Sequence, residues 1–287
     1  MSDIDDFAID GRAVAKALRA EVAAEAARLR GEGIVPTLAV VVPTDDEGTA
    51  WYVRSIKKAA EKEGVDCRIE HLKEPGRDEI TVKLQELSAD ATVHGIICQT
   101  PLPKGVALAQ VGGYISPYKD IDGANPESLG RLAAGLRTWA PATSAAVLEL
   151  LKREDLTLEG ARAVVVGRST VVGKPAALLL LNESATVTVC HSRTKDLAAV
   201  CREADVLVAA VGRAGMIGAD FVKPGATVID VGTNPTEDGG LVGDVDYEAV
   251  SGVARRLTPV PGGVGPVTTA LLLRHTVEAA ELTKTHG

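Results

Sequence analysis

The chain has 287 residues, of which 46% are hydrophobic and 24% are charged, and this composition excludes disordered and rod-like proteins. At about 150 residues per domain, the length predicts two domains. The formal net charge is −8 and no dense basic block occurs, which argues against nucleic-acid binding. No apolar run approaches the roughly 20 residues of a membrane helix, and the acidic start MSDIDDFAID is unlike a signal peptide. The four cysteines form no CxxC pair, so we expect no metal site. Together, these features predict a cytoplasmic protein with no membrane or nucleic-acid partner.

The first half of the chain alternates helix and strand. An apolar stripe predicts a helix over residues 10–30, and the run TLAVVV after Pro36 is too apolar and too short for a surface helix, so it predicts a buried parallel strand. Further along, helices are predicted at about 48–63 and 78–89, and strands at VDCRIEHL and HGIICQ, the second of which ends at Gln99. This order is typical of an α/β layer structure with right-handed crossovers.

A second unit begins near residue 141. Its pattern predicts helices at 144–153, 173–181 and 195–203 between the strand-like runs ARAVVVG, ATVTVCHS, DVLVAAVG and ATVIDVG. We interpret this as a mononucleotide-binding alternation whose all-apolar strands are covered on both faces. The predicted fold class is α/β with two domains, over residues 1–140 and, as a Rossmann-like domain, 141–266. A last helix at about 266–283 is expected to pack back on the first domain, which residues 267–287 would complete.

A glycine-rich turn, GRSTVVGKP over residues 167–175, lies between a predicted strand and a predicted helix. It is not a P-loop, because five residues separate its glycines and Pro175 takes the place of the hydroxyl that would bind magnesium. It also lacks the GxGxxG fingerprint, since Ser169 replaces the second glycine. A glycine turn before a helix N-terminus nevertheless suits a pyrophosphate. From the turn alone, cofactor binding and a plain β-to-α connection are equally open.

The end of the next strand bears on which cofactor would bind. An NAD site places a carboxylate about 20 residues after the turn, but the strand here ends in His191, Ser192, Arg193 and Thr194. Arg193, together with Arg168 and the Ser192 hydroxyl, would suit the 2′-phosphate of NADP. The alternative is that Arg193 is a solvated surface cation. The set of two arginines and a serine favours NADP.

The turn GRSTVVGKP and the strand end CHSRT (190–194) belong to an ordered set of motifs. The set has five further segments: CQTPLP (98–103), KDIDG (119–123), VIDVGTN (228–234), GDVD (243–246) and TPVPGGVGPVT (258–268). With them, essentially the whole chain resembles the 5,10-methylenetetrahydrofolate dehydrogenase/cyclohydrolase family. The resemblance implies an N-terminal folate domain and a C-terminal NADP domain. It also implies oxidation of 5,10-methylenetetrahydrofolate to the methenyl form with NADP as hydride acceptor, hydrolysis of that product to 10-formyltetrahydrofolate in most members, and a homodimer formed through the cofactor domains.

The resemblance assigns roles to single residues. Asp122 would accept both donors on the pterin edge, Gln99 would contact the folate at the end of its strand, and Tyr52 would stack on the ring system. Without the resemblance, Gln99 would be a strand-ending polar residue and Tyr52 an ordinary residue of an amphipathic helix. Asp120 is expected to be a turn or surface acid. The remaining assignments are three residues that let the backbone approach folate and nicotinamide (Pro261, Gly262, Gly263) and seven that bind the cofactor (Gly167, Arg168, Ser169, Gly173, Ser192, Arg193, Thr233).

Among several departures from the family pattern, one bears directly on catalysis. The family's Tyr-x-x-x-Lys motif carries the lysine of the cyclohydrolase step, but here the helix reads Tyr52-Val-Arg-Ser-Ile56. Residues four apart share a helix face, so Ile56 would lie beside Tyr52 with no proton to exchange. Lys57 and Lys58 point about 100° and 200° further round the helix and are expected to be solvated. Ser55 is nearer the required face but is a weak base without a partner.

The sequence therefore predicts an NADP-dependent methylenetetrahydrofolate dehydrogenase whose cyclohydrolase activity is absent or weak, with Tyr52, Ile56, Gln99 and Asp122 at the catalytic positions. Three alternatives stay open. The first is a fully bifunctional enzyme that uses Lys57 or a water, and the second is a non-catalytic paralogue that binds NADP and folate. The third is the same scaffold acting on another one-carbon or amine substrate.

Overall fold

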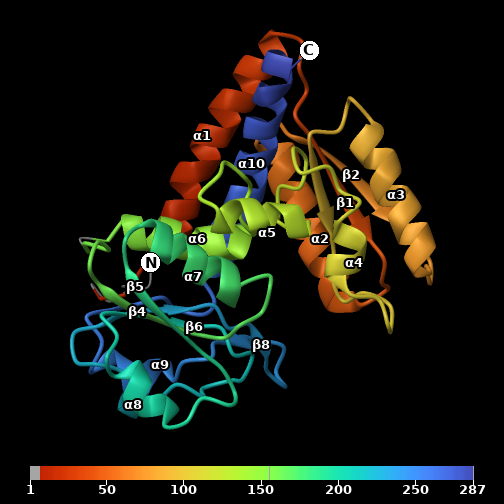
Figure 1. Cartoon of the computed structure of the whole chain (residues 1–287). Helices are drawn as coiled ribbons and strands as arrows, with labels where there is room; N and C mark the ends of the chain where they lie inside the picture. The colour runs from red at the N-terminus through yellow and green to blue at the C-terminus, as the bar shows by residue number, and fades with distance from the viewer. Residues whose placement is uncertain (1–6, 155, 287) are drawn as a thin grey trace. The chain divides into compact units, whose positions relative to one another are not determined.

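The computed structural model describes residues 7–154 and 156–286, and it divides into two compact units (Figure 1). The N-terminal unit consists of Lys16–Ala142 and the residues from Thr269 onward. The C-terminal unit consists of Thr143–Thr268 together with the described residues up to Ala15. The predicted two-domain α/β fold is confirmed, and the last helix joins the first domain as the sequence predicts.

A three-stranded parallel sheet forms the centre of the N-terminal unit, in the order β2-β1-β3. β1 (Thr37–Val42) and β3 (Gly95–Cys98) are buried along their whole length, as their apolar runs predict. β2 (Asp66–His71) is an edge strand and is more polar and more exposed. Because all three strands run in the same direction, the residues that follow β1 and β3 emerge at one edge of the sheet.

Helices cover both faces of β1. On one face, α3 (Arg77–Ala89) and α4 (Leu108–Gly112) pack their apolar side chains against Ala39 and Val41. Leu38 and Val40 point to the other face and are equally buried. The unit also contains α5 (Pro126–Ala133) and α2 (Glu47–Lys62), and it shares α1 (Gly11–Gly31) and α10 (Val264–His286) with the C-terminal unit.

The C-terminal unit contains a five-stranded parallel sheet in the order β10-β7-β6-β4-β5. Its strands are β4 (Arg162–Val166), β5 (Thr186–Cys190), β6 (Val206–Ala209), β7 (Thr227–Asp230) and β10 (Arg256–Leu257). Figure 1 shows α6 (Ala142–Lys152) and α7 (Gly173–Asn182) on one face and α8 (Leu197–Cys201) and α9 (Tyr247–Ser251) on the other. The chain order reverses around β4, and in open α/β sheets ligands bind outside the carboxyl ends of the strands at such a point.

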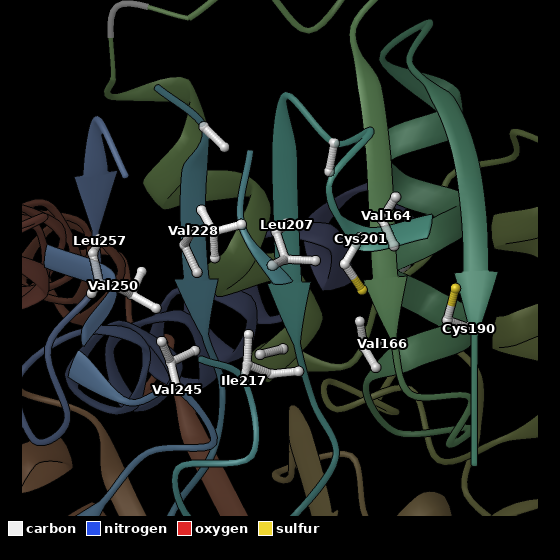
Figure 2. Packing of buried hydrophobic residues seen from close by; sticks show 14 residues of the cluster. Val164, Val166, Cys190, Cys201, Leu207, Ile217, Val228, Val245, Val250 and Leu257 are labelled. Atoms are coloured by element: carbon white, nitrogen blue, oxygen red, sulfur yellow. The ribbon is translucent and has the colours of Figure 1, made fainter. Parts of the chain in front are cut away.

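An aliphatic core fills the space between this sheet and the α8–α9 layer. Figure 2 shows side chains of β4, β6 and β7, among them Val164, Leu207 and Val228, together with Ile217 and Val250 from the layer that covers them. All five are 3% exposed or less. With so few aromatic residues in the chain, branched aliphatic side chains supply the bulk of this core.

The sequence prediction for β5 is wrong in one respect. We expected every strand of this sheet to be covered on both faces, but β5 is an edge strand, and Thr186, Thr188 and Val189 are exposed. The alternation of threonine and valine in this strand is the signal that sequence analysis passed over. Several short elements were also not predicted. These are the helices α4, α5 and α9, the strand β10, a 3₁₀ turn at Ala219–Phe221 and the hairpin of β8 (Asn234–Pro235) and β9 (Leu241–Val242).

Within residues 7–154 and 156–286, no helix combines the length and the apolar character needed to cross a membrane. Over the same residues, His, Cys, Asp and Glu side chains form no cluster of three or more that could hold a metal ion.

Candidate functional site

Gln99 follows β3 directly and is 8% exposed. Its backbone N–H donates to the carbonyl oxygen of Val41 on β1 at 2.9 Å, which continues the sheet pairing by one residue. The carbonyl oxygen of the next residue, Thr100, lies 3.2 Å from the hydroxyl oxygen of Thr49. Since Thr49 belongs to the first turn of α2, this contact joins the loop that carries Gln99 to the helix that carries Tyr52.

α2 begins where the sequence provides a cap. The Asp46 carboxylate accepts from the Thr49 N–H at 2.8 Å and lies 2.9 Å from the Thr49 hydroxyl, and these bonds lower the pKa of Asp46. The cap fixes the start of the helix, and Tyr52 follows one turn later. Thr49 thus contacts both the cap and the Gln99 loop, so the position of α2 against the end of β3 is fixed by a buried side chain.

Tyr52 and Asp122 come close together, as the sequence predicts for two residues of one site. Burial raises the pKa of the Tyr52 phenol, and the Asp122 carboxylate adds to the rise through its negative charge. A hydrogen bond with the Thr269 side chain acts in the opposite direction. Thr269 lies on α10, so the last helix contributes directly to the surroundings of Tyr52.

Asp122 is half-buried in the turn of the KDIDG segment. Its Oδ1 accepts from the Ala142 N–H at 2.9 Å. Gly123 has φ +63°, and a Cβ there would lie 2.6 Å from Pro141 Cδ, so a glycine is required after Asp122. Burial raises the pKa of Asp122 from its ordinary value of 3.8 to about 7, the Ala142 N–H opposes this rise, and the charge of Asp120 adds to it. The carboxyl group is thus poised to change charge near neutral pH.

Asp120 is the carboxylate that sequence analysis expected to be a turn or surface acid. It belongs to a turn, but it is fully buried rather than at the surface. Its oxygens accept from the Ala124 N–H at 2.8 Å, the Asn125 N–H at 2.9 Å and the Ser128 hydroxyl at 2.5 Å. Burial raises the pKa of Asp120 and these three donors act against the rise. The side chain therefore closes the 120–125 turn from inside and is not available to a ligand.

Ile56 lies one turn after Tyr52 on α2 and is 0% exposed. The neighbouring lysines lie on the exposed side of the helix, as expected: both Lys57 and Lys58 are exposed, and the Lys57 ammonium is 3.9 Å from the Glu61 carboxylate. The Ser55 hydroxyl donates to the carbonyl oxygen of Tyr52 at 2.8 Å, a local bond within the helix. The buried side of α2 at this point is aliphatic.

The glycine-rich turn after β4 is as tight as its glycines suggest. Gly167 has φ +137°, and a Cβ there would lie 2.2 Å from the carbonyl oxygen of Ala210, at the end of the neighbouring β6. A Cβ at Gly173 would lie 2.1 Å from the carbonyl oxygen of Gly167. The oxygen of the exposed Ser169 side chain accepts from the N–H groups of Val172 and Gly173, and the hydroxyl keeps its own proton as a donor. The turn thus presents a hydroxyl donor at the N-terminus of α7.

The predicted arginines follow the same edge of the sheet. β4 and β5 are paired in parallel, with Val166 opposite Cys190, and the Gly167 N–H donates to the Cys190 carbonyl at 2.9 Å. Arg168 therefore follows β4, and Ser192 and Arg193 follow β5, at neighbouring strand ends, and all three side chains are exposed. The turn after β5 is closed by the His191 N–H, which donates to the Thr194 hydroxyl, and by the Arg193 N–H, which donates to His191 Nδ1 at 3.1 Å.

Two buried carboxylates support this edge, and sequence analysis missed their role. Asp230, at the end of β7, accepts from the N–H groups of Gly232, Asp244 and Val245, each at 2.9 Å. Asp244 in turn accepts from the N–H groups of Val211, Gly212 and Arg213, the loop that follows β6. Burial raises the pKa of Asp230 to about 6. The signal was present in the segments VIDVGTN and GDVD, which place an acid at a strand end and another in the following loop.

Thr233 and the PGG segment also lie in the C-terminal unit. Thr233 is exposed and follows Gly232, within the loop that Asp230 fixes. Pro261 is exposed, whereas Gly262 and Gly263 are buried. A Cβ at Gly262, whose φ is +118°, would lie 3.3 Å from Arg12 Nε, so this segment is closely packed, as its glycines suggest.

Comparison with known proteins places these features in a family. Residues 9–122 match the model of the tetrahydrofolate dehydrogenase/cyclohydrolase catalytic domain, and residues 141–284 match that of the tetrahydrofolate dehydrogenase/cyclohydrolase NAD(P)-binding domain. The chain belongs to the tetrahydrofolate dehydrogenase/cyclohydrolase family. The resemblance that the motifs indicate is therefore confirmed, and so is the prediction of an NADP-dependent methylenetetrahydrofolate dehydrogenase.

Relatives of this family match along almost the whole chain. The bifunctional protein FolD of Parafrankia sp. (strain EAN1pec) is 61% identical over 95% of this chain and 98% of its own length. Among solved structures, the FolD methylenetetrahydrofolate dehydrogenase/cyclohydrolase of Campylobacter jejuni has a TM-score of 0.94 and 40% identity, and covers 96% of this chain and 99% of its own. The Trypanosoma brucei enzyme, solved with NADP cofactor and inhibitor, has a TM-score of 0.90 and 37% identity, and covers 96% and 97%.

The C-terminal unit fits the cofactor of this family, NADP. At Gly167, the backbone of the turn after β4 lies so close to the backbone after β6 that there is no space for a side chain. The Ser169 hydroxyl and the N-terminus of α7 suit a pyrophosphate, and the exposed Arg168 and Arg193 suit a further phosphate group.

The pKa of Asp122 predicts a pH dependence of folate binding. In the role that the resemblance assigns to Asp122, the ionised carboxylate would accept both pterin donors and protonation would remove one acceptor. On that assignment, kcat/KM for the folate substrate is expected to fall about tenfold per pH unit below pH 7. The measurement is a pH profile of NADPH formation, with the KM for NADP in the same buffers as the control. Asp122→Asn is expected to lower kcat/KM about 10- to 100-fold and to flatten the profile. A wild-type profile that stays level down to pH 5.5 would contradict the role of this carboxyl group.

The position of Arg193 predicts the basis of cofactor preference. On the predicted role of Arg193, Arg193→Gln would remove a charge-assisted bond to the 2′-phosphate, so kcat/KM for NADP is expected to fall about 10- to 100-fold while that for NAD hardly changes. Arg162→Gln is the matched control, because Arg162 is an exposed arginine that begins β4 at the opposite end of the same sheet. Equal losses with NADP and NAD in the Arg193 variant would show that the arginine does not read the 2′-phosphate.

Proposed function

We propose that this chain oxidises 5,10-methylenetetrahydrofolate to 5,10-methenyltetrahydrofolate with NADP, and that its cyclohydrolase step is absent or weak. One observation carries the second part: the helix position one turn after Tyr52 holds a fully buried isoleucine, and the adjacent Lys57 is exposed and lies near Glu61. The family motif has a lysine where Ile56 stands. Neither Lys57 nor Lys58 lies on the buried side of α2, so the alternative of a substituted base is not favoured.

Dehydrogenation transfers a hydride and needs little proton transfer by the protein. When bound, NADP supplies the hydride acceptor, and the folate nitrogen lone pair stabilises the cation that forms. The part of this chain is to hold the pterin: the Asp122 carboxylate accepts its two donors, Tyr52 stacks on its ring, and Gln99 contacts it from the end of β3. Pro261, Gly262 and Gly263 would let the backbone approach both rings. None of these roles needs an amine.

Hydrolysis of the methenyl product is different, because water must be activated and a proton must move. A positioned acid or base contributes about 10²- to 10⁴-fold to such a step. The Ile56 side chain has no proton to exchange, and the Ser55 hydroxyl is engaged with the Tyr52 carbonyl. Burial and the nearby Asp122 charge raise the pKa of the Tyr52 phenol, so the phenol stays protonated. We therefore expect methenyltetrahydrofolate to leave the enzyme unhydrolysed.

Restoring the lysine tests this proposal. Ile56→Lys is expected to accelerate methenyltetrahydrofolate hydrolysis at least tenfold over the wild type, by roughly the lower end of the range for acid–base catalysis. The loss of the methenyl absorbance measures the reaction, with the uncatalysed decay subtracted. Ile56→Met, which is of similar size and has no amine, is the matched control and is expected to stay at the wild-type rate.

The same assays separate the alternatives. Clear acceleration by the wild-type protein would contradict the loss of cyclohydrolase activity. Binding of NADP without any reduction of it by methylenetetrahydrofolate would contradict the dehydrogenase and favour a non-catalytic paralogue. Melting temperature and dehydrogenase activity of Ile56→Lys establish that the variant is folded, because a buried ammonium carries a desolvation cost.

We also propose a homodimer formed through the C-terminal unit, as the family resemblance implies. Support comes from β5, an edge strand of the sheet whose residues Thr186, Thr188 and Val189 are exposed, and from Leu181 at the end of α7, which is 57% exposed. An exposed edge that presents unpaired backbone groups and apolar side chains readily pairs with another chain.

Val189→Asp is expected to shift the protein from dimer to monomer in sedimentation velocity, because it places a charge on the edge that would be buried. Val82→Asp, at a more exposed valine on α3 of the other unit, is the control and is expected to leave the dimer intact. A monomeric wild-type protein at micromolar concentration would contradict the proposal.

A further inference from the structure

A buried histidine contacts the turn that presents Asp122. His275 lies on α10, is 6% exposed, and its Nδ1 is 2.9 Å from the carbonyl oxygen of Ile121, the residue before Asp122. A carbonyl oxygen only accepts, so Nδ1 must carry the proton and donate. Burial lowers the pKa of His275 to about 4, so the ring is neutral at physiological pH. His275 is therefore a fixed hydrogen-bond donor and not a general acid or base.

The ring of His275 is itself held in place. Its centroid is 5.2 Å from that of Trp139, with 32° between the planes. Trp139 Nε1 donates to the carbonyl oxygen of Tyr118, at 3.4 Å, so the indole contacts the start of the same segment. A neutral ring packed in this way has little freedom to move its Nδ1–H away from Ile121.

Ile121 is confined between α10 and β3. A Cβ on Gly95, the first residue of β3, would lie 3.0 Å from Ile121 Cγ1 and 2.8 Å from the hydroxyl of Thr276, the neighbour of His275. The backbone of Ile96 donates to the Lys119 carbonyl at 2.8 Å. The segment is therefore fixed at its start by β3 and at Ile121 by His275.

The remaining side of the turn is held by the Asp120 carboxylate, through the N–H groups of Ala124 and Asn125. Asp122 stands between these two fixed points, with Oδ1 bonded to the Ala142 N–H. A carboxylate that must meet two parallel donors tolerates little rotation, because bidentate bonds are directional. The carbonyl that His275 binds is one residue from the group whose direction matters.

We propose that His275 is a positioning residue for the folate substrate: its bond to the Ile121 carbonyl sets the direction in which the Asp122 carboxylate meets the pterin edge. The inference rests on the proposed role of Asp122 in binding the pterin. It concerns the ground-state fit of the substrate, so the effect belongs in the KM for the folate, with kcat and the KM for NADP little affected.

His275→Leu and His275→Asn test the proposal in the full-length protein. Leucine removes the donor, whereas the asparagine Nδ2 occupies nearly the place of histidine Nδ1 and restores it. His275→Leu is expected to raise the KM for methylenetetrahydrofolate about tenfold with kcat and the KM for NADP within about twofold of wild type. His275→Asn is expected to return the folate KM to within about threefold of wild type. A general loss of stability would not give this pattern of selective loss and rescue.

Two further variants keep the test decisive. His94→Leu is the matched control, because His94 is also a buried histidine of the N-terminal unit but contacts the N–H of Thr37, at the start of β1. It is expected to lower the melting temperature without changing the folate KM. Where His275→Leu does not fold, the pair His275→Asn and His275→Gln replaces it, since the glutamine amide sits near Nε2 and misplaces the donor. Glutamine is then expected to raise the folate KM and asparagine is not.

An unchanged folate KM in His275→Leu, or in His275→Gln where that pair is used, would overturn the proposal, as would a rise that asparagine does not reverse. A wild-type protein that fails to turn over methylenetetrahydrofolate would instead count against the proposed function. A normal wild-type activity that Asp122→Asn lowers and the His275 variants leave unchanged would count against the positioning role alone.

Discussion

Buried carboxylates bonded to backbone N–H groups hold loops of both units in place. Asp120 closes the 120–125 turn, which follows α4 and lies beside β3 at Ile96, in the N-terminal unit. Asp230 and Asp244 hold the loops after β7 and β6 in the C-terminal unit. An ionised carboxylate out of water costs several kcal/mol unless donors replace its hydration. The backbone donors of each loop replace the water that its carboxylate gives up, so the loop and the buried side chain stabilise each other.

This constraint explains why the motifs look as they do. In KDIDG the first acid closes the turn, and the second bonds to the Ala142 N–H and is the one that we propose binds the pterin, so two identical side chains two residues apart have different surroundings. In VIDVGTN and GDVD, one acid fixes the backbone that carries the other, which in turn fixes the loop after β6. Short acidic motifs of this kind act on the backbone first, and on a ligand only through the loop that they shape.

The fold could be predicted from the sequence because its signals are local. β1 and β3 are predicted by continuous apolar runs, and α2 is predicted within one or two residues of its bounds, whereas its Asp46 cap is found only in the structure. For β5, the alternation of threonine and valine indicates an exposed face, but its place at the edge depends on the order of strands in the sheet, which sequence periodicity does not give.

The residues of the candidate site likewise fall into those with a local sequence signal and those placed only by tertiary packing. Asp122, Gln99 and the Gly167 turn follow strand or motif patterns and could be named in advance. The burial of Asp120 and the contact of His275 with Ile121 could not, because the second joins residues 154 positions apart through tertiary packing alone. Motifs identify the candidate ligand-binding residues, whereas the buried residues that contact their loops are found only in the folded chain.

The ionisation of Asp122 links the candidate site to the stability of the fold. Its pKa is about 7 in the folded protein and near its ordinary value of 3.8 when exposed, so between these values the folded state binds a proton that the unfolded state does not. Stability from this group is therefore gained as the pH falls through 7 and lost as the pH rises, while recognition of two pterin donors needs the ionised form. The two requirements oppose each other at neutral pH. The turn is held by Asp120, by the Ala142 N–H and by the neutral His275, so it keeps its shape while Asp122 changes charge. If the pterin binds as we propose, its two donors add to the Ala142 N–H as partners of the ionised carboxylate, so binding would favour release of the proton.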